Sequence, residues 1–314
     1  MRVLVVNAGS SSLKLSVLGP ADEILADLTI DPWDGGPDHD ELRRFLGGQP
    51  GLEAVGHRVV HGGSRFTAAT VIDDQVIAAI ADLTDLAPLH QPRALAGIRA
   101  ARAALPGLPQ VACFDTAFHA GLPLAAARYA LPADWTERFG LRRYGATRCG
   151  NLDPGLLMWL LQHGGLSADE VSHGIEHGAC LAGLAARPDG SGDMREVRAA
   201  ADAGSPAARL AIDVHTHRLR QEIAAMAAAM DGLDALVFTD GIGEHQPQVR
   251  ADAAAGLGFL GVAIDPARND EAVEGDAEIT APSAGVRTLV IAAREDAEIA
   301  RQVRATLSPS RPGI

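Results

Sequence analysis

The first fourteen residues, MRVLVVNAGSSSLK, constrain the fold of this chain more than any other segment. The aliphatic and β-branched run at 2–6 is typical of a buried strand. It stops at a small polar turn, Asn7–Ser12, and apolar residues resume at Leu13, with Lys14 between apolar neighbours. Such a turn can surround a phosphate with backbone N–H groups, hydroxyls and a nearby cation. An ordinary Ser-rich hairpin turn explains the same residues.

Composition places the chain among ordinary globular proteins. It has 314 residues, 47% hydrophobic and 21% charged, and this length favours two domains. The net charge of −13, without a basic run, argues against nucleic acid and anionic membrane as partners. No apolar stretch has membrane-spanning length, and no signal peptide is visible. The three cysteines lack metal-ligand spacing and indicate reduced thiols, so we expect a cytoplasmic protein.

Polar or glycine-rich residues directly follow several predicted strands. These strands lie at 52–60, 110–114 and 235–238. Ala-rich segments at 94–104 and 199–230 are predicted helices, the second almost continuous. Strand-rich and mixed segments fill the first part of the chain, and helix-rich segments fill the second. We therefore predict two lobes that hold a ligand in a cleft between them.

Four side chains in the first half are candidates for chemistry, and each has a plainer alternative. Arg58 lies in an apolar strand and needs an anionic partner, which an internal salt bridge would also supply. Asp115, at a strand end, could cap the next turn, move a proton or help hold Mg²⁺. Arg148 could stabilise a phosphoryl group during transfer, or could be a surface arginine. His90 is held between two prolines, where a histidine is more often structural than catalytic.

The second half offers weaker signals. The turn at Asp240–Gly243 follows a strand and precedes a helix, so its glycines could let the backbone approach an anionic ligand. Glu295 and Asp296 begin the last predicted helix, where their charge complements the helix dipole without any metal. His215 and His217 are two positions apart on a helix and do not face one another, so a metal site there is not expected.

Taken together, the sequence resembles the acetate kinase family, with its propionate and butyrate kinase relatives, in order along nearly the whole chain. The resemblance rests on VLVVNAGSSSLK, GHRVVHGG, APLHQP, FDTAFH, LRRYG, ATRCGNLDPG, SGDMREV, LVFTDGIGEHQPQVR and EDAEIA. It implies the α/β sugar-kinase/Hsp70/actin (ribonuclease H-like) fold, with two lobes of mixed sheets flanked by helices. The N-terminal lobe would comprise residues 1–144, with a C-terminal helix at 295–314 packed on it. Residues 145–294 would form the nucleotide-binding lobe.

The resemblance also implies an activity. The family transfers a phosphoryl group reversibly between ATP and acetate, or another short-chain carboxylate, and this gives an acyl phosphate and ADP. The expected cofactor is Mg²⁺ or Mn²⁺, with ATP or ADP as co-substrate. The expected partners are the small carboxylate, the nucleotide and a second copy of the chain in a homodimer.

Site roles follow from the matched positions. Arg58 would bind the substrate carboxylate, with His90 near the substrate. Asp115 would be the acid/base residue, and Arg148 would stabilise the in-line transition state. The residues expected to bind ATP are Ser10, Ser12, Lys14, Asp193, Met194, Arg195, Gly241, Ile242, Gly243, Glu244 and His245. The residues expected to bind the metal are Asn7 and Glu295.

The chain departs from the family pattern at residues 144–148, which run YGATR. In the family, LRRYG is followed by a HGTSH motif and then by a HLGNG phosphate loop, before the TRxGxxDP motif. Here both intervening motifs are missing, so we predict a truncated second lobe whose sheet has lost strands. In addition, Asp240 stands where the family usually has Gly, His245 where it has Asn, and Arg294 where it has a small polar residue.

Three interpretations follow from the missing segment. The chain is an acetate kinase with full or residual activity; or it is a catalytically impaired member that binds a ligand or is only structural; or a sequence error conceals an intact kinase. Loss of one transition-state donor costs about 10²–10³ in rate, and loss of a whole loop should cost more.

Overall fold

The chain divides into two compact units. The structure, a computed structural model, describes residues 1–9, 12–33, 40–127, 129, 138, 141–144, 152, 154–187 and 190–308. Unit 1 comprises Met1–Ala146 and Arg294–Ile314, and unit 2 comprises Thr147–Ala293. The last helix therefore belongs to the unit that the N-terminus begins.

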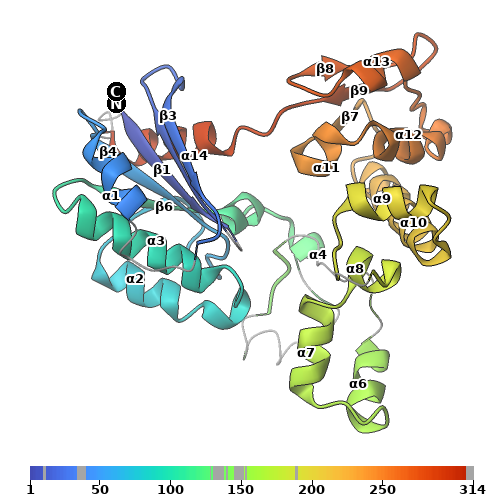
Figure 1. The fold of residues 1–314 in the computed structure, drawn as a ribbon, viewed down its shortest axis with the longest axis horizontal. Coiled ribbons are helices and arrows are strands. Elements are labelled where there is room, and N and C mark those ends of the chain that lie inside the picture. Colours follow the sequence, from blue (N-terminus) through green and yellow to red (C-terminus); the bar gives the residue numbers. More distant parts are fainter. Residues whose placement is uncertain are drawn as a thin grey trace. The chain divides into compact units, whose positions relative to one another are not determined.

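Unit 1 contains a six-stranded mixed sheet with the strand order β3-β2-β1-β4-β6-β5 (Figure 1). Its strands are β1 (Val3–Ala8), β2 (Leu13–Leu18), β3 (Ile24–Ile30), β4 (Ala54–Val59), β5 (Thr70–Val71) and β6 (Gln110–Phe114). The strands β1, β4 and β6 are parallel neighbours, and the others pair antiparallel. Its helices are α1 (Asp40–Gly47), α2 (Asp74–Ala81), η1 (Thr84–Leu86), α3 (Gln91–Ala104), η2 (Asp115–His119), α4 (Leu124–Ala127) and α14 (Glu295–Leu307).

Strand β1 shows why both faces of this sheet are covered. All six of its residues are buried, and successive side chains point to opposite faces. Leu4 and Val6 belong to a core cluster that includes residues of α3, whereas Val3 and Val5 belong to a cluster that includes residues of α14. A strand buried on both faces needs a continuous apolar run, which is what the sequence at 3–6 provides. Each such side chain contributes about 1.5–3 kcal/mol by leaving water.

Unit 2 is richer in helix and contains a three-stranded sheet with the order β7-β9-β8. Its strands are β7 (Ala235–Phe238), β8 (Ala277–Glu278) and β9 (Arg287–Val290). Its helices are α6 (Pro154–Gln162), α7 (Ala168–Glu176), α8 (Cys180–Ala185), α9 (Met194–Asp202), α10 (Pro206–Ala229), α11 (Asp240–His245), α12 (Pro247–Ala255), η3 (Gly258–Leu260) and α13 (Pro266–Glu271). One core cluster joins β7 and β9 to α12, and another joins α8, α9 and α10.

The prediction of one nearly continuous helix over 199–230 is wrong at one point. Helix α9 ends at Asp202, and α10 begins at Pro206. Gly204 takes a left-handed backbone conformation with φ of 94°. The Ser205 side chain then accepts a hydrogen bond from the Ala208 amide and caps α10. The Gly-Ser-Pro sequence at 204–206 is a standard boundary between two helices, but the Ala-rich composition on both sides favoured the prediction of one helix.

The unit 2 sheet has the same pairing as one half of the unit 1 sheet. In unit 1, β4 is parallel to β6, and β5 is antiparallel to β6. In unit 2, β7 is parallel to β9, and β8 is antiparallel to β9. Among the strands that the structure describes, unit 2 has no counterpart of the β3-β2-β1 meander. The two predicted lobes thus contain a six-stranded sheet and, in the described residues, a three-stranded sheet, and the smaller second sheet agrees with the predicted loss of strands.

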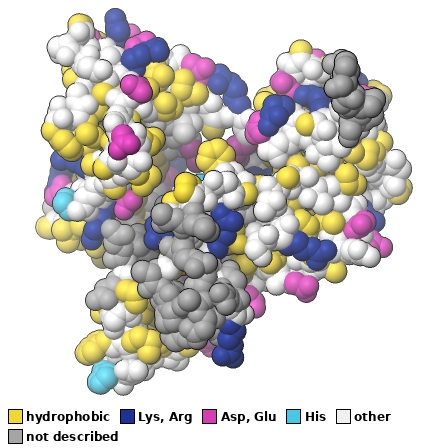
Figure 2. Space-filling model, turned by 180° about the vertical axis from the view of Figure 1, so that it is seen from behind, with side chains coloured by type: hydrophobic (Ala, Val, Ile, Leu, Met, Phe, Trp, Pro, Cys, Tyr) yellow, Lys and Arg dark blue, Asp and Glu magenta, His cyan; other side chains and the backbone are white. Residues whose placement is uncertain are grey.

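Unit 2 also leaves apolar side chains in contact with water. In β7, Leu236 and Phe238 are buried, whereas the alternate residues Ala235 and Val237 are exposed. No residue of the apolar helix α6 is buried. Figure 2 shows hydrophobic side chains scattered among charged ones on one face of the molecule. In the described ranges, no helix combines the length and apolar character that crossing a membrane requires.

Buried His57 in β4 should make the stability of the protein depend on pH. Its Nε2 is 2.8 Å from Gln110 Oε1, its Nδ1 has no partner among the described residues, and burial lowers its pKa from 6.5 to about 4. Below pH 6.5 the unfolded chain takes up a proton that the folded chain does not. Stability is therefore full above pH 6.5 and falls towards pH 4, by up to about 3 kcal/mol. Urea unfolding between about pH 7 and pH 5 should show a smaller decrease for His57→Gln than for the wild type. Equal decreases would contradict this assignment.

Candidate active site

Polar side chains gather where three parallel strands of unit 1 end. Asn7 is the next-to-last residue of β1, Arg58 is the next-to-last residue of β4, and Asp115 directly follows β6. Because β1, β4 and β6 are parallel neighbours, their carboxyl ends meet at one edge of the sheet. Glu295, the first residue of α14, lies within hydrogen-bond distance of two of these side chains. The fold thus brings together four residues that the sequence singled out.

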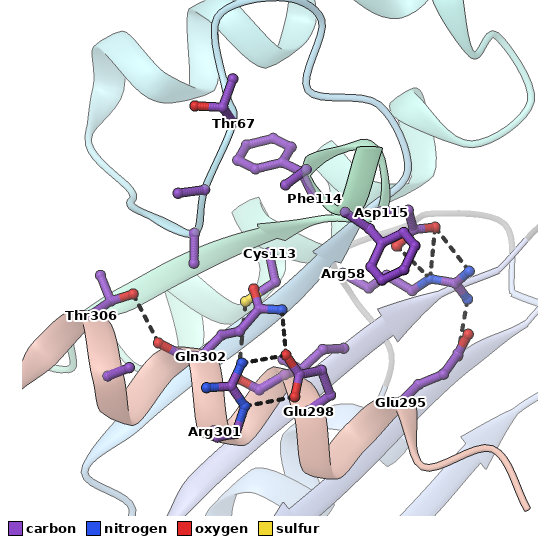
Figure 3. A pocket seen from close by; sticks show the side chains of 16 residues that line it. Arg58, Thr67, Cys113, Phe114, Asp115, Glu295, Glu298, Arg301, Gln302 and Thr306 are labelled. Atoms are coloured by element: carbon purple, nitrogen blue, oxygen red, sulfur yellow. Dashed lines mark hydrogen bonds and ion pairs between the residues drawn. The ribbon is translucent and has the colours of Figure 1, made fainter. Parts of the chain in front are cut away.

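Arg58 is the centre of this cluster. Its guanidinium donates from Nη2 to Asp115 Oδ2 at 2.9 Å, and from Nε to both oxygens of the same carboxylate at 3.1 Å. Its Nη1 donates to Glu295 Oε2 at 3.1 Å and to Asn7 Oδ1 at 3.5 Å. The Asn7 Nδ2 also donates to Glu295 Oε2 at 3.1 Å. One arginine therefore holds two carboxylates and an amide in a single network, and Figure 3 shows its contacts with Asp115 and Glu295.

The network is open to small ligands. The side chains of Arg58, Asp115 and Glu295 are 32%, 38% and 47% exposed. This is the internal salt bridge that the sequence also allowed, but water reaches it, which weakens an ion pair. A soluble anion could therefore compete for the guanidinium at modest cost. The salt-bridge interpretation and the binding interpretation of Arg58 are compatible.

A groove begins at this cluster and runs beside α14 (Figure 3). Its volume is about 650 Å³, and Arg58, Asp115 and Glu295 are among its lining residues. Apolar side chains such as Phe114 and Ile299 also line it. The arginine network is thus part of the wall of a groove on unit 1.

The oxygen atoms of the cluster suit a hard divalent cation. Asn7 Oδ1 and the Glu295 carboxylate are the ligand types that Mg²⁺ prefers, and Mg²⁺ usually keeps several waters beside one or two protein ligands. The part of the chain that the structure describes has no group of three or more His, Cys, Asp or Glu side chains that could hold a metal ion. The residues present therefore fit a metal held by few protein ligands, completed by water and phosphate oxygens.

Lys14 lies next to this site across the first hairpin. It pairs directly with Asn7 in the antiparallel register of β1 and β2, so the two side chains share a face of the sheet. Lys14 is the exposed residue of an otherwise buried β2. The Ser12 carbonyl accepts a hydrogen bond from the Gly9 amide at 2.8 Å and closes the turn. A cation and a polar turn therefore adjoin Asn7.

His90 precedes α3, and a residue beside it was missed by sequence reasoning. Gln91 is fully buried and clamps His61, donating to its carbonyl at 2.8 Å and accepting from its amide at 3.4 Å. Thr116 makes a second contact with this loop, since its Oγ1 accepts a hydrogen bond from the Gly62 amide at 2.9 Å. These contacts fix the loop after β4 relative to η2, next to Asp115. The only sequence signal was an amide residue inside the Pro-bracketed turn.

The candidates at the start of α9 in unit 2 are locally paired or buried. Asp193 is the N-cap, and its carboxylate accepts hydrogen bonds from the Arg195 amide and guanidinium. These bonds lower the pKa of Asp193 to about 2. Met194 is only 3% exposed and packs in a core cluster of unit 2. Arg195 is exposed.

Gly241–His245 form the short helix α11 after β7. Asp240 has a φ of 62°, in the left-handed region that favours glycine, and its carboxylate accepts a hydrogen bond from the Gly241 amide. A Cβ at Gly243 would lie 3.2 Å from the Phe238 backbone, so this close approach favours glycine. Glu244 Oε1 accepts from the Ala293 amide at 2.8 Å, and His245 Nδ1 is 3.1 Å from the Val273 carbonyl.

Two predicted site residues, Ser10 and Arg148, lie outside the described residues. The other predicted site residues lie in unit 1, in the cluster and at Ser12, Lys14 and His90, and in two segments of unit 2.

Comparison with known proteins identifies relatives along almost the whole chain. The model of the acetokinase family matches residues 42–146 and 146–301. Acetate kinases from Leifsonia xyli and from Synechococcus sp. are each 37% identical, over 96% of this chain and 97% and 98% of the relatives. Among solved structures, Porphyromonas gingivalis acetate kinase matches with a TM-score of 0.84 and 28% identity. A propionate kinase from Francisella tularensis matches with 0.86 and 27%. These cover 98% of this chain and 100% of the solved chains.

The same comparisons locate a missing segment. The alignment with the Leifsonia protein spans 390 residues, whereas this chain has 314, so at least 76 aligned positions have no residue of this chain opposite them. The two matches to the family model meet at Ala146. This is the place where the sequence runs YGATR, and where unit 1 gives way to unit 2.

Packing of α14 on β4 should control the position of Glu295. A Cβ added at Gly56 would lie 2.7 Å from Cγ2 of both Ile299 and Val303, so Gly56→Ala must displace α14. We expect about 1–3 kcal/mol of destabilisation in urea unfolding. Gly47→Ala, in the helix α1, is the matched control, since a Cβ at Gly47 would meet no atom within 4 Å. It should be neutral or stabilise by up to about 1 kcal/mol. Equal effects of both substitutions would rule out this packing argument.

Proposed function

The chain belongs to the acetokinase family, and on that premise we propose that it catalyses Mg²⁺-dependent, reversible phosphoryl transfer between ATP and acetate or a related short-chain carboxylate. The products in the forward direction are acetyl phosphate and ADP. The observation that carries the proposal is the network of Asn7, Arg58, Asp115 and Glu295, at the ends of three parallel strands. In this network the Arg58 guanidinium can bind a carboxylate, and the oxygen atoms of Asn7 and Glu295 beside it can bind a metal ion.

Arg58 binds the substrate carboxylate in this proposal. In the structure its guanidinium is paired with Asp115 and Glu295. Because these pairs are partly exposed, exchange of one protein carboxylate for the substrate carboxylate replaces one charge-assisted hydrogen bond with another. The bidentate geometry of the guanidinium fixes the orientation of the substrate, so that one carboxylate oxygen faces the γ-phosphorus.

The reaction makes one bond and breaks one. The substrate oxygen forms a bond to the γ-phosphorus, the bond from that phosphorus to the β–γ bridging oxygen breaks, and ADP leaves with the electron pair. Asp115, the acid/base residue of the proposal, also keeps the Arg58 guanidinium in place through three donor contacts. Arg148 stabilises the charge on the transferring group. His90 lies near the substrate.

Asn7 and Glu295 hold the metal, which when bound neutralises phosphate charge. Lys14, Ser10 and Ser12 contact the phosphates of the nucleotide. The net charge of −13 makes such local cations necessary, because the field of the whole protein repels the nucleotide. The remaining nucleotide contacts in the proposal are Asp193, Met194, Arg195, Gly241, Ile242, Gly243, Glu244 and His245.

Other properties of the family complete the proposal. We expect Mg²⁺ or Mn²⁺ as the metal, a homodimer and a cytoplasmic location. The missing segment removes donors from the nucleotide-binding side, so turnover should be slower than in relatives that retain it. Sedimentation of the purified protein measures the oligomeric state directly.

Removal of Arg58 or Asp115 should abolish most of the turnover. Acyl phosphate formed from acetate, ATP and Mg²⁺ can be trapped with hydroxylamine and quantified. We expect Arg58→Ala and Asp115→Ala each to lower kcat/KM by about 10²–10³, since each removes a charge from the reacting site. Arg102→Ala is the control, because it breaks a surface ion pair between Arg102 of α3 and Asp74 of α2. Full activity of Asp115→Ala would falsify the assignment. Wild-type protein that binds ATP in calorimetry without turnover would instead support a ligand-binding role.

Glu295 should determine the metal requirement. Glu295→Gln removes the charge that attracts the cation but keeps a side chain of the same size, so the Mg²⁺ concentration for half-maximal activity should rise about tenfold or more. The matched control is Asp296→Asn, one residue further into α14, where the carboxylate instead accepts a hydrogen bond from the Ser16 hydroxyl. Identical Mg²⁺ titrations for wild type and Glu295→Gln would remove Glu295 from the metal site.

A further inference from the structure

Arg250, in helix α12, is a fully buried arginine whose hydrogen-bond partners among the described residues are all uncharged. It is 0% exposed. Its Nε donates to Asn269 Oδ1 at 2.8 Å, and its two terminal nitrogens donate to four main-chain carbonyls at 2.7–2.9 Å. The carbonyls belong to Gly243, Glu244, Asn269 and Ala272. All five N–H donors of a guanidinium can be used in such a site.

The charge of Arg250 is not matched by a contacting carboxylate. Each of the five hydrogen bonds that the structure describes for it ends on an amide or carbonyl oxygen. Burial lowers the pKa of the guanidinium, and the nearby charge of Asp270 opposes this only in part. Burying an unpaired charge is expensive, and most buried arginines contact a carboxylate. The protein therefore retains a positive charge at a position where a neutral side chain would be easier to bury.

Two of the five bonds hold the backbone of the turn after β7. The carbonyls of Gly243 and Glu244 accept from Nη1 of Arg250 at 2.9 and 2.7 Å. The other bonds anchor the guanidinium to Asn269 and to the end of α13, and Asn269 Nδ2 in turn donates to the Pro247 carbonyl at 2.9 Å. The turn is thus fixed to the rigid elements α12 and α13. Without Arg250, two partly buried carbonyls of the turn would lose this donor.

The same turn carries two carboxylates. Asp240 and Glu244 lie at its start and near its end, and both would repel a phosphate. The Arg250 guanidinium, held against the main chain of this turn, offsets that charge from the buried side. A fixed charge in a low-dielectric interior acts more strongly on a nearby ligand than a solvated one.

We infer that Arg250 is a positioning residue for nucleotide binding, which fixes the 241–245 turn and supplies positive potential for the phosphates of a nucleoside di- or triphosphate. The inference rests on the proposed function, because that proposal places the nucleotide at this turn. Arg250 itself does not touch the ligand, since it is buried beneath the backbone.

Three full-length variants test the inference. Arg250→Met removes the charge and the donors, and Arg250→Lys keeps the charge but has a different donor geometry. Arg220→Met is the matched control, because Arg220 also donates to a main-chain carbonyl of α12, that of Asp252, away from the turn. The readouts are amide hydrogen exchange of residues 241–245, the Kd for Mg·ADP by calorimetry, and the KM for acetate.

In Arg250→Met we expect faster exchange at residues 241–245 and a Kd for Mg·ADP raised about tenfold or more, because both the fixed backbone and the nearby positive charge are lost. The KM for acetate should stay within about twofold. Arg250→Lys should restore part of the ADP affinity, because it restores the charge. Arg220→Met should match the wild type in exchange at the turn and in Kd.

Other results would overturn the inference. Unchanged exchange in a folded Arg250→Met protein would show that Arg250 does not hold the turn. Faster exchange with an unchanged Kd would reduce Arg250 to a structural role. If Arg250→Met does not fold, Arg250→Lys is the variant that tests the inference. Exchange at residues 241–245 and a Kd for Mg·ADP equal to those of the wild type in Arg250→Lys would exclude a role for the guanidinium geometry. Wild-type protein that fails to bind Mg·ADP would refute the nucleotide proposal, whereas hydrogen exchange would still report whether Arg250 holds the turn.

Discussion

The parallel pairing of β1, β4 and β6 is the constraint on which the rest of unit 1 depends. Parallel neighbours end at the same edge of the sheet, so whatever follows each strand must share that space. Here Asn7, Arg58 and Asp115 share it. The strands themselves are buried on both faces, which prevents them from shifting register without moving apolar side chains out of the core. The precision of the cluster is therefore a consequence of the core.

Helix α14 completes this arrangement from the far end of the chain. Ile299 and Val303 pack against β4 at Gly56, where the absence of a side chain lets the helix approach the sheet. Glu295 is thereby placed beside Arg58, and Asp296 is tied to Ser16 of β2. Arg58 is the counter-ion of both carboxylates of the cluster. Two acidic groups can stay close together only because this cation lies between them.

Much of this could be predicted from the sequence, for identifiable reasons. The aliphatic runs that end at Val59 and Phe114 fix the strand ends, so the placement of Arg58 and Asp115 follows from local pattern alone. The family resemblance was needed to connect them with Asn7 and Glu295, because no local rule relates residues 288 positions apart.

The remaining features depend on tertiary packing. Nothing in the sequence around Arg250 shows that it is buried, since an arginine on a helix is usually exposed. Gln91 was equally hidden, because its role depends on the His61 backbone 30 residues earlier. Ala-rich composition concealed the break between α9 and α10, since alanine favours helix whatever its neighbours require.

The two sheets together show where the missing segment acts. Since β7, β9 and β8 pair as β4, β6 and β5 do, the strand of unit 1 with no described counterpart in unit 2 is above all β1, with its hairpin partner β2. In unit 1 that hairpin carries Asn7 and Lys14, the residues suited to metal and phosphate. The core that joins β7 and β9 to α12 does not depend on such a hairpin, because its members come from elements that unit 2 retains. Truncation therefore leaves this core in place, whereas the alternate face of β7, with Ala235 and Val237, and the apolar helix α6 remain exposed to water.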